Sequence, residues 1–99
     1  MLTGKQRAYL KALAHDIEPV VYIGKDELTD NVVAEMDRYL AVHELVKVKI
    51  QDGCEANPKD LANECASSLH AEYVQAIGKR FVLYRKARKP ENRKIELPK

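Results

Sequence analysis

A glycine followed by a lysine at the end of an apolar stretch is the first feature of this sequence that suggests chemistry. Residues 20–23 are apolar and largely β-branched, which predicts a short buried strand, and Gly24 follows where the backbone must turn. Lys25 lies in that turn, and Thr29 suits the N-cap of a helix that would begin at Asp30. Such a corner directs a lysine and unpaired backbone N–H groups toward one place, which suits a phosphate. An ordinary strand-to-helix turn, which needs glycine for its conformation alone, is the alternative.

Basic residues are concentrated in the C-terminal fifth of the chain. Residues 79–99 contain nine basic and two acidic residues, a net charge of +7, whereas residues 1–78 contain eight basic and thirteen acidic residues, a net charge of −5. Clustered positive charge favours a polyanionic partner, and it favours nucleic acid over a membrane because no strongly apolar helix face accompanies it. A tail that only improves solubility is the alternative. The residues of this region that we expect to contact nucleic acid are Arg80, Arg85, Lys86, Arg88 and Lys89.

Two more basic groups belong to predicted regular structure. Lys5, Arg7 and Lys11 lie off the apolar stripe of a first helix, so its outer face is basic. Lys47 and Lys49 alternate with apolar residues in a predicted strand and therefore point away from the core. These two lysines either bind phosphates or keep an open sheet face soluble, and the pattern fits both. We expect the basic groups of both chain ends and the Gly24–Lys25 corner to converge on one surface.

Nothing in the sequence has the spacing of a catalytic or metal site. Cys54 and Cys65 form no Cys-x-x-Cys motif, and the three histidines fall near predicted helix ends, where they complement the helix dipole. There is no P-loop and no nucleophile elbow. No apolar run approaches the roughly 20 residues of a membrane span, and residues 1–7 lack an apolar signal core. We expect a cytoplasmic protein that is not an enzyme and needs no metal, cofactor or small-molecule substrate.

Periodicity and capping signals predict seven elements in the order α-β-α-β-α-β-β. Thr3 and Gln6 form a capping box for the first helix, and Asn57 followed by Pro58 starts the third. Two strand-helix-strand crossovers predict an α/β (α+β) fold with a four-stranded mixed sheet, parallel neighbours, and the second and third helices on one face. Residues 1–86 form the predicted domain, and residues 87–99, with two prolines, form a predicted basic, mobile tail. The expected strands are 20–23, 45–50, 73–77 and 81–85, with helices over 4–15, 30–40 and 58–70.

The sequence resembles the YhbY-like proteins, which consist of a single CRM domain, an RNA-binding module named for chloroplast RNA splicing and ribosome maturation. The resemblance implies a fold similar to the C-terminal domain of bacterial translation initiation factor three, with a loop similar to the Gly-x-x-Gly loop of KH domains. Gly24 and Lys25 match this loop, but Glu27 stands where the family has its second glycine. Glu27 adds bulk and negative charge at the expected phosphate contact. The stretches that carry the resemblance are 2–7, 9–10, 13–15, 21–28, 43–48, 77–79 and 82–85.

Two hypotheses of function follow. The resemblance and the basic groups favour an RNA-binding protein of large ribosomal subunit assembly, which would bind ribosomal RNA or pre-50S particles mainly through phosphate contacts. The alternative is a protein-binding adaptor or dimeric scaffold that uses an open sheet edge or face and docks its basic tail on an acidic partner.

Overall fold

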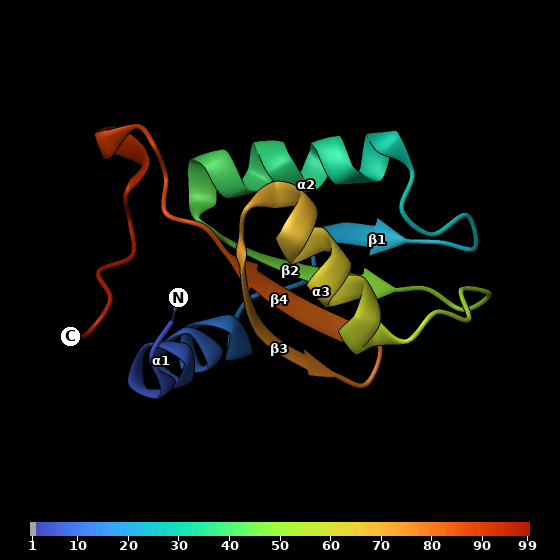
Figure 1. The fold of residues 1–99 in the computed structure, drawn as a ribbon, viewed down its shortest axis with the longest axis horizontal. Helices are drawn as coiled ribbons and strands as arrows, with labels where there is room; N and C mark the ends of the chain where they lie inside the picture. Colours follow the sequence, from blue (N-terminus) through green and yellow to red (C-terminus); the bar gives the residue numbers. More distant parts are fainter. Residues whose placement is uncertain (1) are drawn as a thin grey trace.

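The computed structural model describes residues 2–99 and confirms the predicted order of elements and the four-stranded mixed sheet (Figure 1). A single 3-10 turn, η1, follows the seven predicted elements. The elements are α1 (Gly4–His15), β1 (Val21–Ile23), α2 (Asp30–His43), β2 (Leu45–Ile50), α3 (Pro58–Leu69), β3 (Glu72–Ile77), β4 (Arg80–Tyr84) and η1 (Pro90–Asn92).

The strands lie in the order β1-β2-β4-β3. β1 and β2 are parallel neighbours, whereas β4 is antiparallel to both β2 and β3. The prediction of parallel neighbours is therefore correct for β1 and β2, which α2 connects. It is wrong for β2 and β3, which α3 connects, because β4 lies between them. After α3 the chain places β3 at the sheet edge, and the turn at Gly78 then returns β4 into the position between β2 and β3. Gly78 has a φ of +58°, which this tight turn requires and which glycine adopts without strain.

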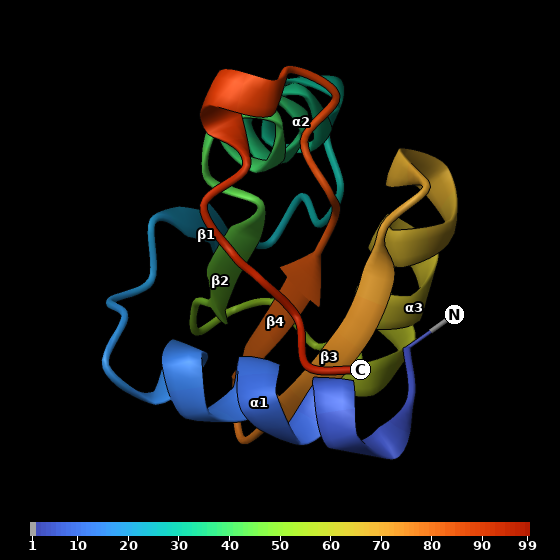
Figure 2. The same ribbon diagram turned by 90° about the vertical axis from the view of Figure 1, so that its left-hand side faces the viewer.

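The two faces of the sheet are covered to different extents. α2 and α3 cover one face, where Met36 and Leu40 pack with Phe81 and other fully buried residues of the strands. α1 lies across the opposite face, and Figure 2 shows it on the far side of the sheet from α2. The α1 side has a smaller cluster that includes Leu10 and Val82 and draws on the start of β2, the start of β3 and the end of β4. Among the helices of residues 2–99, none lies over the half of this face beyond α1.

The C-terminal segment runs back along the domain and is held by one buried carboxylate. Glu44, the left-handed C-cap of α2, has no solvent exposure. Its Oε2 accepts the backbone N–H of Ala87 at 2.8 Å, and its Oε1 accepts those of Lys94 at 2.7 Å and Ile95 at 3.0 Å. Burial alone would raise the pKa of Glu44, but these three donors together with Arg93 lower it. The structure gives part of the predicted tail, residues 87–99, defined contacts with the domain, and its mobility stays a prediction.

The partner of these residues lies far away along the chain, so no local sequence signal could reveal it. Polar composition and two prolines are typical of a free tail, but three of its backbone amides bind a side chain more than forty residues earlier. Ile95 and Leu97 also pack on the α1 side of the sheet, and Gln6 donates from Nε2 to the carbonyl of Pro98 at 3.0 Å. The boundary between domain and tail at residue 86 stays a prediction.

Candidate nucleic-acid interface

The loop after β1 turns tightly and leads into α2. The N–H of Glu27 donates to the carbonyl of Gly24 at 3.0 Å, and the hydroxyl of Thr29 caps α2 by accepting from Val32 N at 3.2 Å. Glu27 has a φ of 56°, in the left-handed region that glycine adopts most easily. The position where this chain departs from the Gly-x-x-Gly pattern is therefore the one whose backbone conformation favours glycine.

Gly24 has a different role from the glycine that Glu27 replaces. Its φ is not positive, and an added Cβ would come no closer than 3.7 Å to another side chain, Oε1 of Gln51. Among the described residues, neither a left-handed conformation nor crowding requires glycine here. Lys25 is exposed beside the turn at Gly53, as a phosphate contact would need.

A row of four exposed or half-buried side chains crosses the uncovered half of the sheet. Tyr22 pairs with Lys49, Lys49 with Arg80, and Arg80 with Ile77, so the row has one residue from every strand. Their strand neighbours pack into the core on the other face, which directs these four side chains away from α2 and α3. Tyr22 is 49% exposed and Ile77 is 68% exposed, so two large side chains of this row are open to solvent.

One flank of α1 continues this row. Arg7 donates from Nε to the carbonyl of Tyr73 in β3 at 3.3 Å, and His15 lines a hollow of about 180 Å³ together with Lys47 and Arg80. Lys11 lies four residues from both Arg7 and His15, so it belongs to the same flank. We call the surface formed by α1 and the sheet the basic face. It consists of Arg7, Lys11, Lys47, Lys49 and Arg80, with Lys25 in the loop that follows β1.

Lys5 of α1 and Lys47 of β2, which were also predicted to bind, differ in how many of their hydrogen-bond donors are free. Lys5 is exposed in the first turn of α1. Lys47 donates from Nζ to the carbonyl of Ala14 at 3.2 Å, so one of its three donors already satisfies the C-terminal end of α1. Lys47 therefore has a structural task and still has donors for a ligand.

The side chain of Arg85 is engaged in hydrogen bonds within the protein. Its guanidinium donates to the carboxylate of Asp37 at 2.8 Å, to the carbonyl of Asp37 at 3.0 Å and to the carbonyl of Leu69 at 2.9 Å. The side chain is only 21% exposed. These bonds link the end of β4 to α2 and α3, which leaves little of the guanidinium for RNA.

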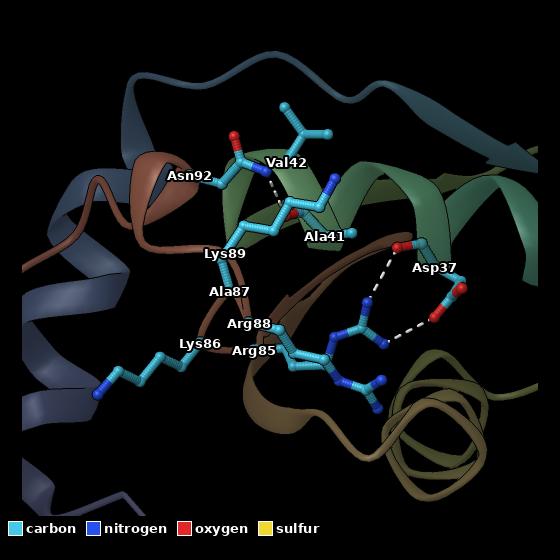
Figure 3. Close-up of a pocket in the computed structure, with 9 residues that line it drawn as sticks. All are labelled: Asp37, Ala41, Val42, Arg85, Lys86, Ala87, Arg88, Lys89 and Asn92. Carbon is cyan, nitrogen blue, oxygen red and sulfur yellow. Dashed lines mark hydrogen bonds and ion pairs between the residues drawn. The ribbon is translucent and has the colours of Figure 1, made fainter.

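The other basic residues near Arg85 gather around a second site. Lys86, Arg88 and Lys89 line a cavity of about 350 Å³ between α2 and the C-terminal segment, with Ala41 and Asn92 beside them (Figure 3). The chain after β4, which lines this cavity, and the loop after β1 lie toward opposite ends of the longest axis of the molecule (Figure 1). The expectation that all basic groups share one surface is therefore not met, because the structure divides them between the basic face and this second cluster.

Sequence reasoning missed several groups that border the basic face. Tyr22, Gln51 and Lys79 line a hollow of about 290 Å³ beside Lys49. Lys79 is paired with Asp52 at 2.8 Å, and this hydrogen bond raises the pKa of Lys79 and lowers the pKa of Asp52. The sequence could have predicted that Tyr22 faces outward. It is the middle residue of a three-residue strand whose other two residues are buried, and successive side chains of a strand point to opposite faces.

Across residues 2–99, no three His, Cys, Asp or Glu side chains are grouped as a metal ion would need. Over the same residues, no helix has the length and apolar character that crossing a membrane requires.

Comparison of the sequence and the structure with known proteins identifies a family. Residues 2–85 match the CRS1/YhbY (CRM) domain. The probable RNA-binding protein YqeI of Bacillus subtilis is 37% identical over 98 residues, which cover 99% of this chain and all of YqeI. An RNA-binding protein of Haemophilus influenzae is 40% identical over 99% of this chain and 96% of its own. The solution structure of the hypothetical protein SAV1595 from Staphylococcus aureus superimposes with a TM-score of 0.82 at 39% identity, covering 99% of this chain and 100% of that one.

Proposed function

This chain belongs to the CRS1/YhbY (CRM) domain family, and we propose that it is a cytoplasmic RNA-binding protein that acts in large ribosomal subunit assembly. Its partner would be ribosomal RNA or a pre-50S particle. The names of its relatives in Bacillus subtilis and Haemophilus influenzae support RNA as the ligand. The observation that carries the proposal for this chain is the basic face, because it joins cations from α1, β2 and β4 on the side of the sheet opposite α2 and α3.

Phosphate contacts would supply most of the affinity. Lys49 and Arg80 are adjacent across β2 and β4, and Lys11 extends the same surface along α1. Cations distributed in this way suit a backbone that runs along the surface, which the protein would recognise by its shape and charge. If about five phosphates are neutralised, the logarithm of affinity should fall with the logarithm of salt at a slope of roughly −3.5 to −4.5.

Two further features support this mode of binding. Gly24 has no internal reason to be glycine, and a nucleic-acid backbone that comes close to the loop would explain it. The second cluster, Lys86, Arg88 and Lys89, would contact RNA that extends past the domain, since it lies at the far end of the molecule. Arg85 would contribute by holding the end of β4 in place.

The experiment is titration of the full chain with large-subunit ribosomal RNA at several salt concentrations. Lys49→Glu combined with Arg80→Glu should weaken binding more than tenfold and reduce the salt slope by roughly 1.4 to 1.8, since two phosphate contacts are lost. The matched control is Lys59→Glu, an exposed residue in the first turn of α3, on the other side of the sheet. An affinity that does not change with salt, or an equal loss in the control, would contradict the proposal.

A second measurement addresses the adaptor hypothesis. The purified chain should sediment with large-subunit precursors before RNase treatment and should be released after it. If the chain stays bound after the RNA is digested, protein contacts dominate and the chain is an adaptor.

A further inference from the structure

We infer that the hollow beside Tyr22 holds one unpaired nucleotide of the bound RNA, with its base stacked on the tyrosine ring. This inference rests on the proposed RNA binding and adds the class of RNA that the site takes. The preferred ligand is then a helix with a bulged or single-stranded nucleotide, and a continuous duplex is the weaker ligand.

The first step is the position of the Tyr22 ring. Val21 and Ile23 on either side are buried in the core, so Tyr22 faces the uncovered half of the sheet. Its hydroxyl donates to the carbonyl of Pro19 at 3.3 Å, which directs the polar end of the side chain back to its own strand. About half of the residue is exposed. An exposed ring whose polar end is tied back to the backbone is preorganised for stacking.

The second step is the chemistry of the hollow. Besides Tyr22 it is lined by Lys49 and Lys79, which carry positive charge, and by Gln51 and Asp52, which have hydrogen-bonding groups. A nucleotide needs an aromatic surface for its base, a cation for its phosphate and polar groups for the base edge, and Tyr22, Lys49 and Gln51 supply these in a volume of about 290 Å³. Asp52 already pairs with Lys79, so the carboxylate does not leave an unbalanced negative charge in the site.

The third step is the connection to the phosphate-binding loop. The N–H of Gln51 donates to the carbonyl of Ile23 at 2.8 Å, and its side-chain oxygen lies near Gly24. The hollow therefore opens directly beside the loop that we propose to contact the RNA backbone. A backbone held at Gly24 and Lys25 can place a neighbouring base over Tyr22.

The fourth step decides the class of RNA. Both faces of a base inside an A-form helix are covered by its neighbours, and the major groove is too deep and narrow for side chains to read the bases. Only a base that has left the stack can present a face to Tyr22. A site with a single aromatic ring accepts one such base and tolerates any base identity, because every base has an aromatic face.

The test compares two labelled RNA probes by fluorescence anisotropy, a continuous duplex and the same duplex with one bulged nucleotide. The parent chain should bind the bulged probe more tightly. Tyr22→Ala should weaken binding of the bulged probe by roughly five- to hundredfold, the usual range for loss of one stacked base, and should leave duplex binding nearly unchanged. Tyr22→Phe keeps the ring and should keep the preference.

Tyr9→Ala is the matched control, because Tyr9 is also exposed, at 40%, but lies on α1 beside a different groove. It should retain the preference for the bulged probe. Equal affinity of the parent for both probes, or an equal loss on both probes in Tyr22→Ala, would overturn the inference while salt-dependent RNA binding stands. If the parent binds neither probe and no ribosomal RNA, the proposed function itself fails, and this inference fails with it.

Discussion

Replacing Glu44 with glutamine tests what holds the C-terminal segment on the domain. The substitution keeps the size of the side chain and the same backbone preference at a φ of 68°, so it changes only the charge and one acceptor oxygen. Glu44 is fully buried and receives three backbone N–H groups from residues 87–95. We expect the free energy of unfolding to fall and the C-terminal segment to open more often.

The magnitude follows from the three bonds. A glutamine can offer its one oxygen to the amides of Lys94 and Ile95, and its NH₂ group then faces the N–H of Ala87, a residue only 2% exposed. A buried donor without an acceptor costs about 1–3 kcal/mol, and each of the two remaining bonds loses roughly 1 kcal/mol without the charge. We therefore expect a loss of about 3–5 kcal/mol.

Urea unfolding at neutral pH measures this loss, and hydrogen exchange at Ala87, Lys94 and Ile95 shows whether the segment opens. Glu91→Gln, the same chemical change at an exposed residue of η1, is the control and should be neutral. Because the folded pKa of Glu44 lies below the ordinary value of 4.5, the advantage of the parent should be complete above that pH and disappear as the pH falls through the lowered pKa. A Glu44→Gln protein within about 0.5 kcal/mol of the parent, with unchanged exchange, would refute this account.

Four other predictions concern the loop, the tail and the core. Glu27→Gly should raise the free energy of unfolding by about 1 kcal/mol, because it relieves a φ of 56°, and should tighten RNA binding by removing negative charge; thermal unfolding and anisotropy measure the two effects. Lys25→Glu should weaken RNA binding about tenfold without a change in melting temperature, since the side chain is exposed. Truncation after Arg85 should lower the salt slope by roughly 0.7 to 0.9 for each lost phosphate contact and should also lower the free energy of unfolding, because it removes the three N–H donors of the buried Glu44; the same titration and urea unfolding measure the two effects. Burial raises the pKa of Cys65 to about 12, so a thiol reagent at pH 8 should react with Cys65 only at the rate of unfolding, followed by mass spectrometry.

The secondary structure was predictable because its causes are local. The side chains of Thr3 and Thr29 each accept the backbone N–H three residues later, and Asn57 caps α3, so the helix starts follow from residues close in sequence. Alternation in residues 45–50 likewise determined that Lys47 and Lys49 face away from the core. The Gly24–Lys25 corner also depends only on neighbours along the chain, and the structure places it where a strand meets a helix start.

Only the tertiary structure decided which of the basic side chains lie on the same surface. Arg85 binds Asp37 and Leu69, and the C-terminal segment binds Glu44, through contacts between residues 16 to 51 positions apart. The insertion of β4 between β2 and β3 brings Arg80 next to Lys49, and no local pattern specifies that insertion. Periodicity and capping report the conformation of a few neighbouring residues, whereas the composition of a binding surface depends on which distant segments bury one another. For this reason the sequence by itself identified the cations, and the fold determined which of them share a face.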